Sequence, residues 1–131
     1  MSKRTITLTD RPPVSIDEDS WPVIAEARDE EYDGQVRCQA NRISTWAVRV
    51  RQHADGRAIV YATYGHNTNW QGARGYSARR GALLPVGGDI IAAIREVCAA
   101  IADAECSKDD AARWPTLVAD CIADLPTEEL A

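Results

Sequence analysis

Polar and apolar positions alternate with a period of two along three segments in the middle of the chain: residues 35–40, 46–52 and 58–64. This period places successive side chains on opposite faces of a β-strand. In the second segment Trp46, Val48 and Val50 share one face, whereas Arg49 and Arg51 share the other. The pattern therefore predicts an antiparallel meander with one apolar face and one cationic face.

The turn between the second and third segments is indicated by Asp55-Gly56, a pair that favours tight hairpin turns. A two-residue loop would pair Arg49 with Ala62, whereas a loop longer by one residue places Tyr61 and Thr63 on the arginine face. We favour the longer loop, which puts Tyr61 within cation–π reach of the arginines. It also buries four apolar side chains together: Val48, Val50, Val60 and Ala62.

Before the meander, residues 5–9 alternate polar and β-branched side chains and predict a first strand. Arg11-Pro12-Pro13 ends this strand or confines it to an edge, and residues 14–16 extend it briefly. Residues 21–30 follow an acidic stretch with Ser20 as a cap, and they carry a proline in the first turn. We therefore predict a short helix there, frayed at its acidic end.

Glycine and polar residues dominate the connection from 65 to 88. So long a connection is seldom without structure unless it has a functional reason. We expect a short fourth strand around residues 70–78, a binding loop, or both. Pro85 and Gly87-Gly88 mark the end of the connection.

Two helices are predicted after this point. Asp89 is placed to cap the first, and Ser107 to cap a further helical turn. The first helix has apolar residues at one-face spacing: Ile90, Ile94, Val97, Cys98 and Ile101. A second amphipathic helix is predicted over residues 115–125, after Trp114-Pro115.

Together these elements predict an α+β fold, in which a three- or four-stranded antiparallel sheet (a meander) is covered on its apolar face by the C-terminal helices. A length of 131 residues fits a single domain, 1–131. We distinguish three parts: an acidic N-terminal strand and short helix at 1–33, an arginine-rich sheet and loop at 34–88, and an acidic helical segment at 89–131.

Charge is segregated along the chain, although the net charge is only −5. Residues 34–88 hold eight arginines and one acid, Asp55, and so carry about +7. The flanks carry about −5 over residues 1–33 and about −7 over residues 89–131. We expect a cationic sheet face that is open to solvent and partly neutralised at its edges by the acidic flanks.

No residue pattern fixes a reaction, and we predict a protein that is not an enzyme. His53 lies beside the turn and is interpreted as an exposed strand end. His66 follows a strand end, where catalytic groups are often mounted, but no partner carboxylate is evident. The glycine-rich segment lacks the Lys-Ser/Thr ending of a phosphate-binding loop. We predict no catalytic residue and no cofactor.

The four cysteines show no C-x-x-C pair, and the two histidines are remote from them in sequence, so we predict no metal site. Cys98 and Cys121 fall at apolar helical positions and are interpreted as buried free thiols. A disulfide between them is geometrically possible but is not expected in a reducing compartment. No apolar run approaches the roughly 20 residues that span a bilayer, and the start lacks a signal peptide, so we expect a cytoplasmic location.

Arginines and aromatic residues of the central block suit planar and stacked recognition. We predict partner binding by nine residues: Arg37, Arg49, Arg51, Tyr61, Trp70, Arg74, Tyr76, Arg79 and Arg80. One hypothesis is nucleic-acid binding through these groups. The other is a protein-binding inhibitor or adaptor, whose acidic flanks imitate a phosphate array. An alternative to both is that the arginines pair with the chain's own acids.

Three segments carry a resemblance: TITLTDRPPV at 5–14, WAVRVRQHADGR at 46–57 and NWQG at 69–72. They are similar to small uncharacterised accessory proteins of bacterial mobile elements and phages. The resemblance implies an accessory role, such as inhibition of host defence in the manner of anti-CRISPR proteins, and it transfers no residue's function.

We therefore predict a non-enzymatic protein-binding module, most sharply an inhibitor of a nucleic-acid-handling host complex such as a CRISPR effector. The predicted partner is a host protein or a protein–nucleic acid complex, with no membrane involved. Direct nucleic-acid binding is the alternative, and the oligomeric state stays open.

Overall fold

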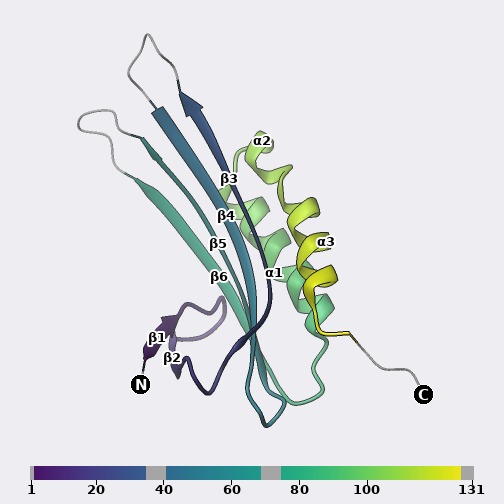
Figure 1. Ribbon diagram of the computed structural model, residues 1–131. Helices are drawn as coiled ribbons and strands as arrows, with labels where there is room; N and C mark the ends of the chain where they lie inside the picture. Colours follow the sequence, from purple (N-terminus) through teal and green to yellow (C-terminus); the bar gives the residue numbers. More distant parts are fainter. Residues whose placement is uncertain (1, 35–40, 69–74, 128–131) are drawn as a thin grey trace.

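The computed structural model describes residues 2–34, 41–68 and 75–127. A four-stranded antiparallel sheet packs against the C-terminal helices, and a separate two-stranded sheet precedes it, which confirms the predicted α+β class (Figure 1). In chain order the elements are β1 (Lys3–Ile6), β2 (Val14–Asp17), β3 (Val23–Gly34), β4 (Asn41–Gln52), β5 (Ala58–Thr68), β6 (Tyr76–Leu84), α1 (Ile90–Glu105), α2 (Lys108–Ala111) and α3 (Trp114–Asp124).

The hairpin of β4 and β5 has the predicted register. Arg49 lies opposite Tyr61 and Val50 lies opposite Val60, as the longer loop requires. In the turn, the Asp55 carboxylate accepts the backbone N–H of Arg57 at 2.9 Å, and Gly56 adopts a φ of 99°. A positive φ favours glycine, so Asp55-Gly56 defines this turn as expected.

The predicted helix at 21–30 is wrong, because these residues begin the long strand β3. Ala25 and Ala27 point into the core opposite Val50 and Val48, while Glu26 faces the other way. Alanine, glutamate and arginine favour a helix locally, but pairing with β4 satisfies the backbone and buries the two alanines. Tertiary pairing therefore overrides local propensity.

The other predicted strands differ from the structure in position. The strand predicted at 35–40 lies outside the described residues, and β3 takes its place beside β4. A fourth strand does exist, but it is β6, which extends well beyond the predicted 70–78. The predicted first strand at 5–9 is replaced by β1, which starts at Lys3 and pairs with β2.

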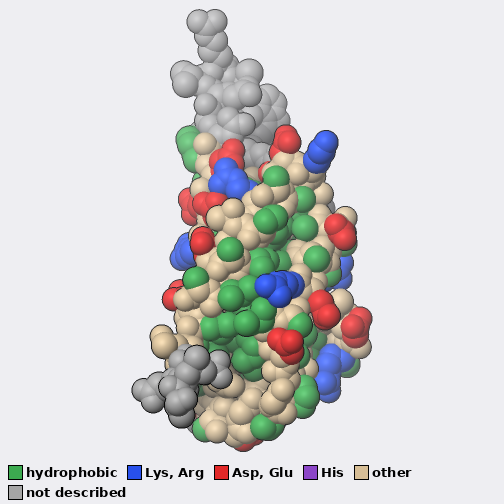
Figure 2. Space-filling model, turned by 90° about the vertical axis from the view of Figure 1, so that its right-hand side faces the viewer, with side chains coloured by type: hydrophobic (Ala, Val, Ile, Leu, Met, Phe, Trp, Pro, Cys, Tyr) green, Lys and Arg blue, Asp and Glu red, His purple; other side chains and the backbone are tan. Residues whose placement is uncertain are grey.

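The C-terminal helices cover one face of the sheet, as predicted. Asp89 caps α1 by accepting the N–H of Ala92, and Ser107 caps α2 by accepting the N–H of Asp110. The core between the layers contains these fully buried side chains, among others: Trp46, Val48, Val50, Val60, Ile94, Ile101, Cys98 and Cys121. Figure 2 shows the outer side of the helical layer, where hydrophobic side chains gather centrally and both acidic and basic side chains lie around and among them.

The opposite face of the sheet is covered at one end by the hairpin of β1 and β2 (Figure 1). Their side chains form a second core with Trp21, Ile59 and Tyr61. The chain just after β1 also touches β6, since the N–H of Thr9 donates to the carbonyl of Gly81 at 2.9 Å. The expectation of an entirely open cationic face is therefore wrong, because the N-terminal hairpin buries part of it.

Candidate functional site

The uncovered part of the helix-free sheet face is here called the open face. Strand register places these described residues on it: Arg28, Glu30, Tyr32, Ile43, Thr45, Ala47, Thr63, Gly65, Asn67, Ser77 and Arg79. Tyr32 lies directly opposite Ile43, and the two residues are 61% and 38% exposed. An exposed aromatic and aliphatic pair on an uncovered sheet face is a feature of interaction surfaces.

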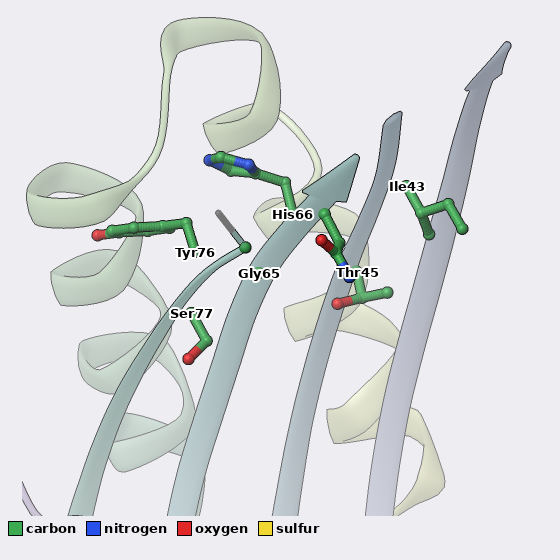
Figure 3. A pocket seen from close by; sticks show the side chains of 8 residues that line it. Ile43, Thr45, Gly65, His66, Tyr76 and Ser77 are labelled. Atoms are coloured by element: carbon green, nitrogen blue, oxygen red, sulfur yellow. The ribbon is translucent and has the colours of Figure 1, made fainter. Parts of the chain in front are cut away.

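A shallow hollow of about 480 Å³ lies on this face (Figure 3). Its centre is the row formed by Thr45, Gly65 and Ser77 on three adjacent strands. Gly65 makes the row concave because it has no side chain. A Cβ at Gly65 would meet the carbonyl oxygen of Tyr76 at 2.9 Å, so a larger residue does not fit without a shift.

Two rings border the hollow. His66 and Tyr76 stack with ring centroids 5.3 Å apart, as Figure 3 shows. The Tyr76 hydroxyl donates to Glu105, and this hydrogen bond raises the pKa of Tyr76. Tyr76 thus bridges the sheet edge to the end of α1 and is not presented to a partner as a free platform.

Cys106 is the most accessible of the described cysteines, but it is not arranged as a nucleophile. Burial raises the pKa of its thiol, and the Trp114 Nε1 donates to its sulfur at 3.3 Å. Burial also raises the pKa of Cys98 to about 12 and that of Cys121 to about 11. Thiols with raised pKa values are poor nucleophiles, and the interpretation of Cys98 and Cys121 as buried free thiols is confirmed.

Arg49 and Arg51 share the predicted sheet face but differ in surroundings. The Arg49 Nε donates to Glu26 at 3.0 Å and remains at the surface. Arg51 is buried under the N-terminal hairpin, where its Nε donates to the Tyr61 hydroxyl at 2.9 Å and its Nη1 to the Trp21 carbonyl at 3.0 Å. Arg51 and Tyr61 therefore stabilise the fold and are not available to a binding partner. They contact each other through a hydrogen bond, where the sequence predicted a cation–π contact.

Arg79 and Arg80, adjacent on β6, face opposite sides of the sheet. Arg80 faces the helices, and its Nη2 donates to Glu105 at 2.9 Å. Arg79 faces the open side and has no ion pair with any described residue. The remaining predicted binding residues, Arg37, Trp70 and Arg74, lie outside the described residues.

A second hollow, of about 110 Å³, lies where β1 meets the sheet. We call it the arginine hollow because four arginines line it: Arg4 on β1, Arg49 on β4, and Arg79 and Arg80 on β6. Arg4 and the nearby threonines were not predicted as binding residues. The alternation of residues 5–9 indicates a strand, but nothing in it indicates that this strand docks beside the arginines.

Ion pairs join two central arginines to the acidic flanks, since Arg49 pairs with Glu26 and Arg80 pairs with Glu105. Other ion pairs lie within the flanks: Arg4 with Glu18, and Arg113 at the start of α3 with Asp29 and Glu31 on β3. The pairs within the flanks lower the pKa of Glu18 and of Asp29. Part of the segregated charge is thus matched internally.

The described residues contain no cluster of three or more histidine, cysteine or acidic side chains placed to hold a metal ion. Within the same part of the chain, no helix is both long and apolar enough to cross a membrane. Comparison of the chain with protein-family models, with curated proteins and with solved structures gives no match.

Proposed function

We propose that this chain is a non-enzymatic protein-binding module that contacts its partner through the open face. The observation that carries this proposal is the exposed pair of Tyr32 and Ile43, at the end of the sheet that the N-terminal hairpin does not cover. The cores of protein interfaces are enriched in tyrosine and arginine and in desolvated apolar groups, and binding energy is concentrated in a few of them.

The charges around this pair fit a protein partner better than a polyphosphate. Arg28 and Glu30 alternate with Tyr32 on β3, and Arg79 lies across the sheet. Of the arginines predicted to bind, Arg49 and Arg80 are already paired with carboxylates, and Arg51 is buried. Affinity for nucleic acid depends on the number of phosphates along the backbone that cations neutralise, and carboxylate partners reduce the net positive charge that Arg49 and Arg80 offer to such an array.

The sharpest form of the proposal is an inhibitor of a nucleic-acid-handling host complex, such as a CRISPR effector, acting in the cytoplasm. This form of the proposal is supported by the negative charge of the helical layer, on the side of the molecule opposite the open face. Five acids of the helical layer are exposed: Glu96, Asp103, Asp109, Asp120 and Asp124. Figure 2 shows acidic side chains on this side of the molecule, interspersed with basic ones. Such an array can repel nucleic acid from a bound complex or occupy a basic groove in its place.

Affinity capture tests this proposal. The tagged protein is incubated with a nuclease-treated lysate of the organism that carries the gene, beside two double variants. Tyr32→Ser with Ile43→Ser alters the open face, whereas Ala99→Ser with Ala119→Ser alters exposed helical positions as a matched control. We expect a nucleic-acid-handling protein that the wild type and the control retain, and whose recovery falls at least about tenfold with the open-face variant.

Equal recovery with both variants would contradict binding through the open face. The captured complex is then assayed with added wild-type protein, and we expect its activity to fall with the wild type but not with the open-face variant. If the activity of the captured partner is unchanged, the proposal of protein binding stands but the proposal of inhibition is contradicted.

Direct nucleic-acid binding is the alternative, and it is favoured by Arg79 on the open face, which forms no ion pair with a described residue. It predicts binding of labelled single- or double-stranded DNA or RNA that weakens steeply with salt. Fluorescence anisotropy at about 50 mM salt separates the two cases, because a protein-binding module should show nothing tighter than the weak non-specific range of about 10⁻⁴ to 10⁻⁶ M.

A further inference from the structure

The arginine hollow has an unusual supply of unused hydrogen-bond donors. The carboxylates of Glu18 and Glu26 hold Arg4 and Arg49 through their Nε atoms, so no hydrogen bond to a described residue uses their terminal Nη groups. Arg79 makes no hydrogen bond or ion pair with any described residue. Guanidinium groups anchored at Nε keep their planar pairs of N–H donors available for an oxyanion.

Hydroxyl groups complete the lining. Thr5 and Thr7 line the hollow from the N-terminal hairpin, and Thr63 lies directly opposite Arg79 on β5. A volume of about 110 Å³ exceeds the share of a single water several times. The hollow thus has room for one tetrahedral oxyanion, with the rest of any larger ligand outside.

The local charge also calls for an anion. The lining residues Arg4, Arg49, Arg79 and Arg80 are cationic, and the acids paired with them are Glu18, Glu26 and Glu105, which leaves about +1 on this cluster. A phosphate anion would balance this charge. Charge-assisted bonds between guanidinium and phosphate are among the strongest hydrogen bonds that proteins form.

We propose that the arginine hollow is a binding site for a phosphate group. The lining arginines come from β1, β4 and β6, so the bound group joins the N-terminal hairpin to two strands of the sheet. The site adjoins the open face, with which it shares Thr63 and Arg79, but it lies at the hairpin and away from the Tyr32 end of the sheet.

Isothermal titration with inorganic phosphate, at ionic strength held constant with sodium chloride, tests the site. We expect saturable binding of one phosphate per chain and a rise in melting temperature that chloride does not produce. Arg79→Gln should weaken binding about tenfold, because it removes an exposed donor without disturbing the core. Arg28→Gln is the matched control, since Arg28 is exposed on the open face but does not line the hollow.

Thr63→Val provides a second variant that keeps the shape of the side chain and removes its hydroxyl. Equal weakening by Arg28→Gln and Arg79→Gln, or a melting shift that follows ionic strength alone, would overturn the proposal. So would the absence of saturable binding to the wild type at millimolar phosphate.

Parallel titrations with adenosine monophosphate and with adenosine test whether the natural ligand is free phosphate or a phosphorylated small molecule. Equal affinities for phosphate and the nucleotide, with none for the nucleoside, assign a site for the free anion or any phosphate monoester. A nucleotide that binds at least about tenfold tighter than phosphate, and in a manner sensitive to Arg79→Gln, assigns a phosphorylated small molecule. Binding of adenosine that is insensitive to Arg79→Gln would place the ligand elsewhere.

Discussion

At the scale of single residues, Arg51 is the one charged side chain that is buried among the described residues. A buried guanidinium is tolerated only when acceptors surround it. Here they are the Tyr61 hydroxyl, the Trp21 carbonyl and the more distant carboxylate of Glu18, whose Oε1 is 3.8 Å from Nη2. Arg51 thus belongs to a buried polar network, here called the Arg51 network, that links the sheet to Trp21 and to the N-terminal hairpin.

Tyr61→Phe should lower the free energy of unfolding by about 1–3 kcal/mol, because it removes the acceptor of the Arg51 Nε and leaves a buried charged donor unpaired. Urea denaturation measures this loss. Tyr32→Phe is the matched control, since Tyr32 is 61% exposed and its change should stay within about 0.5 kcal/mol. Equal losses of unfolding free energy in the two variants would mean that the hydrogen bond between Arg51 and Tyr61 does not stabilise the fold.

At the scale of elements, the N-terminal hairpin docks on β6 through one close backbone approach. A Cβ at Gly81 would meet the carbonyl oxygen of Thr7 at 2.5 Å. The same region is held by the hydrogen bond between the Thr9 N–H and the Gly81 carbonyl. A glycine at this position therefore allows the hairpin to cover the sheet.

Gly81→Ala should lower the free energy of unfolding by about 1–3 kcal/mol through overpacking, and should speed hydrogen exchange at the Thr9 amide. Ser77→Ala on the same strand is exposed and should change neither quantity. Unchanged exchange at Thr9 in the glycine variant would show that the hairpin accommodates the added methyl group.

Elements with a local signal were predictable from the sequence. The pairing of β4 with β5 followed from alternation and from Asp55-Gly56, and α1 followed from its cap and apolar spacing. The strand β3 was not predictable, because Ala25 and Ala27 gain their burial from partners far along the chain. The same limit applies to the arginine hollow, since no local pattern tells where the N-terminal hairpin docks.

At the scale of the whole molecule, ion pairs join the acidic flanks to the arginine-rich middle and to each other. Glu26 pairs with Arg49 and Glu105 pairs with Arg80. Arg113 pairs with Asp29 and Glu31, and its guanidinium lies 5.1 Å from the centre of the Trp46 ring. Asp55, beside Arg57, also has a lowered pKa, chiefly because it accepts the backbone N–H of that residue. These carboxylates therefore act as structural partners near neutral pH.

Acid should destabilise the protein. The folded pKa values of Glu18, Asp29 and Asp55 are lowered, so the unfolded state binds protons first as the pH falls through the ordinary carboxyl range near 4. Stability is then full above that range and is lost as the pH falls further through the folded pKa values. Melting temperatures measured between about pH 6 and pH 3 should fall accordingly.

Arg113→Gln should reduce the size of this acid-induced fall, because Asp29 loses the partner that lowers its pKa. Arg95→Gln, at an exposed position of α1, should leave the fall unchanged. A fall of the same size in Arg113→Gln and the wild type would assign the acid sensitivity to other carboxylates.

The packing of α3 against β3 affects the order in which the chain can fold. The inner face of β3 is closed by α3, and the Glu26 N–H donates to the Asp124 carboxylate, 98 positions away in sequence. During synthesis α1 becomes available to cover β5 and β6 first, whereas the inner face of β3 stays uncovered until residues 114–124 have left the ribosome. A chain interrupted before α3 would therefore expose the inner side of β3, including Ala25 and Ala27, to aggregation.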